Sequence, residues 1–244
     1  DAWAAFAQGW VEPALADPER RARDLRCGGT WFVGAGALPN DAQGRVPGGP
    51  PLAAQAVALA RAAAPAAFGW DRAQLSVIFP GYPGPDPGER PAAARFRRER
   101  AGAHVDGLLP VGPERRRVFG ETHLFILGLP LDDPAEGAAP LVVWEGSHEV
   151  MRAAFAEAWR GVAPEAWPET DVTETYQAAR RRCFERLPAV ELPGRRGEAI
   201  LVHRLALHGV APWRAAEAAP PRAAAYFRPA PPHAIARDWL IAAP

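Results

Sequence analysis

The segment RAGAHVDGLLP holds a histidine and a carboxylate two residues apart, His104 and Asp106. In an extended chain, residues i and i+2 point to the same side of the backbone, so both side chains could bind one metal ion. A third ligand must come from elsewhere, and EAILVHRLALHGVAPWR offers His203 and His208 after an apolar run. Two histidines and one carboxylate on one face of an octahedral ion leave three positions open, as oxygen activation at ferrous iron requires.

A guanidinium further along the chain strengthens this interpretation, because a His-x-Asp triplet alone often arises by chance. In PPRAAAYFRP, Arg222 shares one face of an expected strand with Tyr226 and Arg228, while the residues between them point to the other face. A planar guanidinium in a sheet pocket suits bidentate binding of a carboxylate. The sequence therefore predicts a metal site with a carboxylate-binding arginine beside it.

The elements that position these residues are mainly strands. Runs typical of strands occur at 75–79 and 122–131, from Leu141, from Glu198, and in RAAAYFRP. Two helical patterns lie between them, at about 149–186, and residues 1–70 are mainly helical around a turn-rich stretch. We expect a single domain over 1–244, mainly β with flanking helices, in which 71–244 form an antiparallel sandwich or jelly roll with a helical insertion.

The order HVD, PLVVWEGSH, GEAILVHRLALHGVAPWR and PPRAAAYFRP, over about residues 95–229, resembles the phytanoyl-CoA dioxygenase family of Fe(II)/2-oxoglutarate oxygenases. The resemblance implies a double-stranded β-helix of cupin-like jelly-roll form. It implies that iron is bound by His104, Asp106 and His208, which form the catalytic centre, and that Arg222 binds the far carboxylate of the co-substrate 2-oxoglutarate. The implied reaction uses O2 and hydroxylates a small organic molecule, with release of succinate and CO2.

The chain departs from the family pattern at two places. It has Trp-Glu-Gly-Ser-His where the family often has Pro-Gly-Ser/Thr-His, and the segment GPERRR lengthens the loop after HVD on the substrate side of the pocket. The spacing from the distal histidine to Arg222 is also longer than expected. Arg214 is therefore a rival for the carboxylate, although a strand start holds Arg222 more rigidly than a turn holds Arg214. We expect Thr122 and Tyr226 to line the 2-oxoglutarate pocket; a register shift of one residue would place His123 there instead of Thr122.

Composition excludes several other classes. The 28 basic and 28 acidic residues balance, so nothing favours nucleic acid or a membrane surface as a partner. The absence of lysine excludes Schiff-base chemistry and a Walker-type phosphate loop. Two cysteines cannot form a disulfide scaffold, and with no leader-like start or long apolar run we expect a cytoplasmic protein. Arginine clusters at 95–100, 115–117 and 180–182 form either a solvated face or a site for an anionic substrate such as a CoA thioester or phosphate.

Two alternatives stay open from the sequence. The same triad could bind zinc or another divalent ion in a hydrolase or isomerase, with Arg222 holding the substrate itself. The chain could also be a non-enzymatic jelly-roll binding protein. Neither the substrate nor the oligomeric state follows from these residues.

Overall fold

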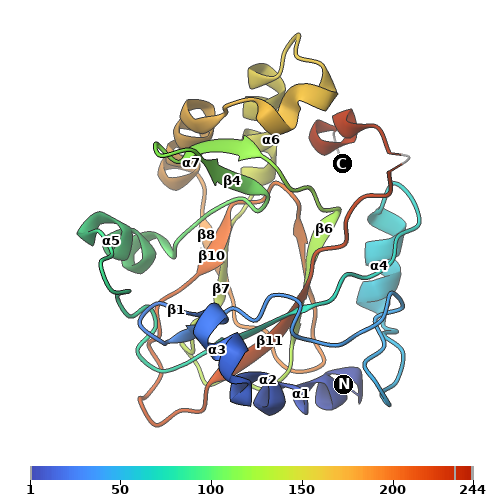
Figure 1. Ribbon diagram of the computed structural model, residues 1–244, viewed down its shortest axis with the longest axis vertical. Helices are drawn as coiled ribbons and strands as arrows, with labels where there is room; N and C mark the ends of the chain where they lie inside the picture. Colours follow the sequence, from blue (N-terminus) through green and yellow to red (C-terminus); the bar gives the residue numbers. More distant parts are fainter. Residues whose placement is uncertain (1, 234, 243–244) are drawn as a thin grey trace.

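The computed structural model describes residues 2–233 and 235–242 (Figure 1). Its larger sheet has six strands with antiparallel neighbours. In spatial order they are β1 (Leu25–Arg26), β2 (Trp31–Phe32), β3 (Gln74–Ile78), β11 (Arg222–Phe227), β6 (Phe125–Pro130) and β9 (Ile200–His203).

A smaller antiparallel sheet lies against the larger one. It has the order β10 (His208–Val210), β7 (Leu141–Trp144) and β8 (Ala189–Leu192), and a backbone bridge joins His104 to His208 at its β10 edge. Apolar side chains of both sheets form one buried cluster that includes Ile126, Leu141 and Val202, so the two sheets face each other across a shared interior. A third pair of strands, β4 (Leu108–Val111) and β5 (Arg116–Phe119), projects beside this sandwich.

Helices cover the outside of the sandwich (Figure 1). The N-terminal helices lie at the bottom of the view and pack on the larger sheet, where Trp3 joins a buried cluster with Leu127 and Phe227. The inserted helices lie at the top, near the described C-terminal end. The helices are α1 (Ala2–Gln8), α2 (Val11–Ala16), α3 (Pro18–Asp24), α4 (Gln55–Ala63), α5 (Pro91–Arg100), α6 (Ser147–Ala158), α7 (Thr173–Arg186) and the 3-10 helices η1 (Pro164–Glu169) and η2 (Arg237–Ile241).

The prediction of a mainly β fold with flanking helices is confirmed, with one correction in the N-terminal part. Residues 1–70 also contribute β1 and β2, which extend the larger sheet through pairing of Trp31 and Phe32 with β3. Two-residue strands are too short to show the alternation that marks a strand in sequence. Within the described residues, no helix is long and apolar enough to cross a membrane.

Candidate metal centre

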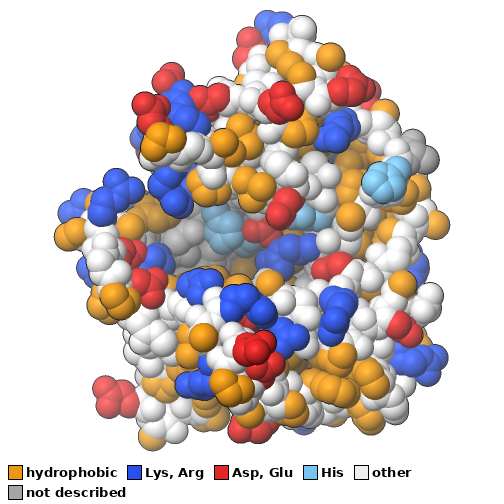
Figure 2. All heavy atoms as spheres, viewed as in Figure 1, with side chains coloured by type: hydrophobic (Ala, Val, Ile, Leu, Met, Phe, Trp, Pro, Cys, Tyr) orange, Lys and Arg blue, Asp and Glu red, His pale blue; other side chains and the backbone are white. Residues whose placement is uncertain are grey.

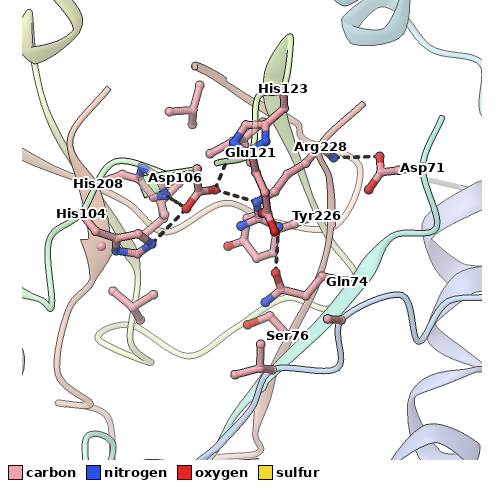
Figure 3. A pocket seen from close by; sticks show the side chains of 18 of the residues that line it. Asp71, Gln74, Ser76, His104, Asp106, Glu121, His123, His208, Tyr226 and Arg228 are labelled. Atoms are coloured by element: carbon pink, nitrogen blue, oxygen red, sulfur yellow. Dashed lines mark hydrogen bonds and ion pairs between the residues drawn. The ribbon is translucent and has the colours of Figure 1, made fainter. Parts of the chain in front are cut away.

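Two neighbouring side chains, His104 and Asp106, converge with one from a distant part of the sequence, His208 (Figure 3). His104 Nε2 lies 3.1 Å from Asp106 Oδ1, and His208 Nε2 lies 3.6 Å from the same oxygen. One donor atom from each of the three residues lies within 4.8 Å of the others. The structure therefore brings together the three residues that the sequence predicts as metal ligands.

Both histidines are oriented for metal binding by the backbone. Nδ1 of His104 lies 3.1 Å from the carbonyl oxygen of Gly102, and Nδ1 of His208 lies 3.0 Å from that of Ala206. A carbonyl only accepts, so each Nδ1 donates, and this hydrogen bond leaves Nε2 of each ring facing the carboxylate. Burial, opposed by the charge of Asp106, lowers the pKa of His208 to about 4.

Asp106 is held as a carboxylate although it is almost buried. Burial alone would raise its pKa, but the charge of His208, the hydrogen bond to His104 and the charge of Arg228 hold the pKa well below its usual value. Its two oxygens face different partners. Oδ1 faces the two histidines, while Oδ2 accepts a 2.6 Å hydrogen bond from Nε of Arg228 and lies 3.9 Å from Nε2 of His123. One oxygen is thus left for a metal ion (Figure 3).

Close backbone packing brings the two metal-binding segments together. His104 and His208 exchange backbone hydrogen bonds of 2.8 and 3.0 Å. A Cβ on Gly209 would lie 2.2 Å from the carbonyl oxygen of Ala101, so only glycine allows β10 to approach this segment. A Cβ on Gly107, at φ +84°, would likewise clash with the carbonyl oxygen of Glu121.

The Gly-Ser-His turn fixes the residue before His208. The hydroxyl oxygen of Ser147, which is fully buried, accepts a 2.8 Å hydrogen bond from the N–H of Leu207. The N–H of Trp144 donates to the carbonyl oxygen of Leu207 at 3.0 Å. Both backbone groups of Leu207 are therefore fixed, which sets the direction of the distal histidine.

A cavity of about 380 Å³ opens from the three residues into the space between the sheets. Figure 2 shows the hollow near the middle of the face, with histidine, acidic and arginine side chains along it. Its inner wall includes Trp31, Ser76, Leu141, Val210 and Tyr226, and its mouth includes Asp71, Arg72 and Glu121. This volume is within the range of small-molecule sites.

Arg222 lies beyond the inner wall of this cavity. It is only 2% exposed, and its guanidinium donates to the hydroxyl of Tyr226 and the carbonyl of Ala139, each at 3.1 Å. No carboxylate of the described residues lies within ion-pair distance of it. The charge of Arg222 acts on the carboxylate of Asp132, which lies beyond ion-pair distance. A buried cation with no carboxylate in contact is costly, so this end of the cavity favours an anionic ligand.

One predicted pocket residue lies elsewhere, and so does the rival arginine. Thr122 does not line the cavity; it faces a separate hollow beside the C-terminal segment, and His123 lines the cavity instead. Neighbouring residues of an extended chain point to opposite sides, so an error of one residue exchanges them. The rival Arg214 is about half exposed and pairs with Glu191, away from the cavity.

His203 is not part of the triad. It lies on β9, where its Nδ1 accepts from the N–H of Leu205 and its ring lies beside that of His148, 4.8 Å between centroids. Burial, with the charge of Arg204, lowers its pKa to about 4. It is a structural histidine at the end of the larger sheet.

Sequence reasoning missed the role of Arg228. Its guanidinium lies in the cavity between Oδ2 of Asp106 and Oε1 of Gln74, 2.7 Å away, and its backbone N–H donates to Asp71. The strand pattern gives its face but not its partner, which lies 122 residues away in sequence. Gln74, on the paired strand β3, could not have been identified by its type alone.

The donor set fits a divalent ion with octahedral preference. Adjacent ligand atoms on such an ion, with bonds of ~2.1 Å, lie about 3 Å apart. The two separations measured to Oδ1 of Asp106, 3.1 and 3.6 Å, are close to this value. The side chain of His104 is 48% exposed, so the site is open on one side.

The sequence matches no protein-family model and no curated protein. Among solved structures it is similar to SnoN, a non-heme alpha-ketoglutarate-dependent epimerase from nogalamycin biosynthesis, at 14% identity over 71% of this chain and 51% of that one, with a TM-score of 0.39. It is also similar to HygX from Streptomyces hygroscopicus with nickel, 2-oxoglutarate and hygromycin B bound, at 14% identity over 75% of this chain and 63% of that one, with a TM-score of 0.40.

A third similar structure is an N-substituted L-amino acid dioxygenase from Burkholderia ambifaria, at 18% identity over 72% of this chain and 62% of that one, with a TM-score of 0.30. The aligned part makes up 48 to 60% of the first three structures found. Scores this low do not establish a shared fold, so the geometry of the site itself must carry the functional conclusion.

Proposed function

We propose that this chain is a non-haem Fe(II)- and 2-oxoglutarate-dependent oxygenase that hydroxylates a small organic molecule and releases succinate and CO2. The observation that carries the proposal is a metal site on the cavity together with a buried guanidinium just beyond the inner wall of the same cavity. The triad of His104, Asp106 and His208 lies at its mouth, and the buried Arg222 lies behind Tyr226 at its inner end. A metal site alone would suit many enzymes, whereas a metal site facing an unpaired buried guanidinium suits a dicarboxylate co-substrate.

The strand order supports a double-stranded β-helix as the scaffold. In the larger sheet β3, β11, β6 and β9 are neighbours, and in the smaller one the His104 segment, β10, β7 and β8 follow one another. From β6 to β11 the chain passes back and forth between two facing sheets, with β6, β9 and β11 in the larger one and β7, β8 and β10 in the smaller one, and such wrapping is expected for a jelly roll. Because Trp3 packs with Phe227 in one core, we also propose that the chain acts as a single domain.

Each residue has a separate task in this proposal. The triad holds the ion on one face, and the Nδ1 hydrogen bonds to the backbone keep both imidazoles in place. When bound, ferrous iron with 2-oxoglutarate and O2 supplies the oxidising power to cleave an unactivated C–H bond. Arg222 and the hydroxyl of Tyr226 hold the 5-carboxylate of the co-substrate, which fixes its other end at the mouth of the cavity.

Charge favours Arg222 over the other two arginines as the carboxylate anchor. Arg214 already pairs with Glu191 at the surface, and Arg228 already pairs with Asp106. Arg222 alone among these three has no carboxylate partner in the described chain, and it is the most buried. Arg228 instead holds the metal-binding carboxylate in position.

The test is an anaerobic titration of the Fe(II)-loaded protein with 2-oxoglutarate. Chelation of ferrous iron by the keto acid produces a visible charge-transfer band, and we expect this band in the wild type and none in His208→Ala. Added succinate, which lacks the keto oxygen, serves as the control and should produce no band. Stoichiometric metal binding without the band would favour the zinc hydrolase or isomerase, and no metal binding would favour a non-enzymatic protein.

A further inference from the structure

A second polar hollow adjoins the candidate metal centre. It measures about 360 Å³ and lies between α5, β5, α7 and the segment that carries His104. His104, Asp106 and Gly107 line both this hollow and the main cavity. We call it the arginine pocket, because its outer wall is formed by Arg117 and Arg180 with the rings of Phe96 and Tyr176.

Arg117, on β5, carries a charge that the chain leaves unneutralised. Its Nη1 donates to the carbonyl oxygen of Leu108 at 3.2 Å, and its side chain is partly buried. Burial lowers the pKa of Arg117, and the positive charges of Arg115 and Arg180 add to this effect. The neighbouring Arg116 differs, because it forms an ion pair with Asp171.

Arg180, on α7, is held in place by aromatic rings and not by a carboxylate. Its guanidinium carbon lies 4.8 Å from the ring centroid of Phe96 and 5.2 Å from that of Tyr176. Contacts of this kind hold the guanidinium in place without neutralising its charge, although Arg180 also hydrogen-bonds to the side chain of Tyr176. Tyr176 is itself buried, so the support is rigid.

The arginine pocket therefore has two ordered cations and no anion to match them. Within the described residues, neither Arg117 nor Arg180 has a carboxylate within ion-pair distance. The one acidic residue of its lining, Asp106, already faces His104, His208 and Arg228. Figure 2 shows basic side chains on this side of the hollow, gathered over α5 and mixed with acidic ones over α7.

We propose that Arg117 and Arg180 form a subsite for an oxyanion group of the substrate, a phosphate or a carboxylate, next to the metal. Each guanidinium has five N–H donors, so two of them still suit the several acceptor oxygens of such a group. The shared wall at His104 places the rest of the same molecule at the open side of the metal site. The role of this subsite in a reaction rests on the proposed function. Its binding of an anion beside the metal does not, because such binding is measurable without turnover.

The experiment uses the whole chain loaded with Co(II), which is paramagnetic, or with diamagnetic Zn(II). Phenyl phosphate is followed by ³¹P NMR, and phenylacetate labelled at its carboxyl carbon by ¹³C NMR; the tighter ligand identifies the anionic group. We expect saturable binding with Co(II)-induced line broadening that Zn(II) does not give. Arg180→Gln should weaken binding at least tenfold, Arg117→Gln similarly, and Arg181→Gln, an exposed neighbour on the same helix, should not.

Several results would overturn the subsite. Affinity unchanged in both variants, or broadening that survives Arg180→Gln because the anion binds Co(II) directly, contradicts it. Binding without broadening shows an anion site remote from the metal and also contradicts it. Arg117 donates to a backbone carbonyl, so thermal unfolding is used to check that Arg117→Gln is still folded. If Arg117→Gln is unfolded, the result for Arg180→Gln decides the test. Arginine-dependent binding near the metal without any 2-oxoglutarate band would support the subsite while refuting the proposed co-substrate.

Discussion

Replacement of Arg222 by methionine separates a co-substrate anchor from a structural arginine. Methionine keeps much of the side-chain volume but removes the buried charge, which has no carboxylate partner in the described chain. Loss of one member of a buried charge pair costs about 3 kcal/mol or more, and 1.4 kcal/mol corresponds to a factor of ten. We therefore expect 2-oxoglutarate to bind about 100-fold more weakly.

The assay is thermal unfolding of the metal-loaded protein with and without 2-oxoglutarate. At 100 times its Kd, a ligand stabilises the folded state by about 2.7 kcal/mol, which raises the Tm of a chain of this size by roughly 5–10 °C. At the same concentration the variant would be half saturated, and the shift would fall to about 1 °C. Arg214→Met, at the exposed rival that pairs with Glu191, should keep the full shift.

The unliganded variant provides the second part of this test. Methionine removes two hydrogen bonds from Arg222 but also an uncompensated buried charge, so the free energy of unfolding should change by less than about 1 kcal/mol. A loss of the 2-oxoglutarate shift in Arg214→Met and not in Arg222→Met would refute the assignment. A large fall in Tm of Arg222→Met without 2-oxoglutarate would show that the arginine is structural.

Three further predictions concern residues around the site. Arg228→Met removes the side chain that donates a 2.6 Å hydrogen bond to Asp106. We expect the Co(II) affinity, measured by calorimetry, to fall by about 10–100-fold, and an unchanged affinity would refute the positioning role of Arg228. Ser147→Ala leaves the N–H of Leu207 unpaired in the core, so chemical denaturation should show a loss of about 1–3 kcal/mol, and a smaller loss would mean that another group accepts. The pKa of His203 is lowered to about 4, so the native state binds fewer protons than the unfolded state and metal-free stability should fall as pH drops from about 6.5 to 4. The contribution of His203 is at most about 3 kcal/mol, and His203→Gln should make this part of the pH profile shallower, while His208, with its pKa also lowered to about 4, keeps the remainder; an unchanged slope would contradict the role of His203.

The strands and the triad were accessible from the sequence for different physical reasons. Long apolar runs such as that of β6 form strands because both faces are buried, and this marks them without tertiary information. The triad could be selected because His104 and Asp106 share a face by spacing alone. Its third member could only be chosen between His203 and His208 by resemblance, since both follow the same apolar run.

What the sequence could not provide depends on contacts between distant residues. Arg228 binds Asp106, and its neighbour Gln74 lies on the paired strand, so neither role has a local signal. The exchange of Thr122 for His123 reflects a register that is set by pairing and packing. Helix α5 carries no buried residue, so it lacks the apolar face that would mark it.

The central claim is that one cavity holds a metal at His104, Asp106 and His208 and a dicarboxylate at Arg222. A crystal structure with Mn(II) and 2-oxoglutarate bound tests this claim directly. The crystals are grown without oxygen, and the Mn(II) ion is located by its anomalous scattering. We expect the metal peak between the three side chains and the far carboxylate of 2-oxoglutarate in contact with Arg222 and the hydroxyl of Tyr226. A metal bound elsewhere, or a carboxylate held by Arg214 or Arg228 in place of Arg222, would contradict it.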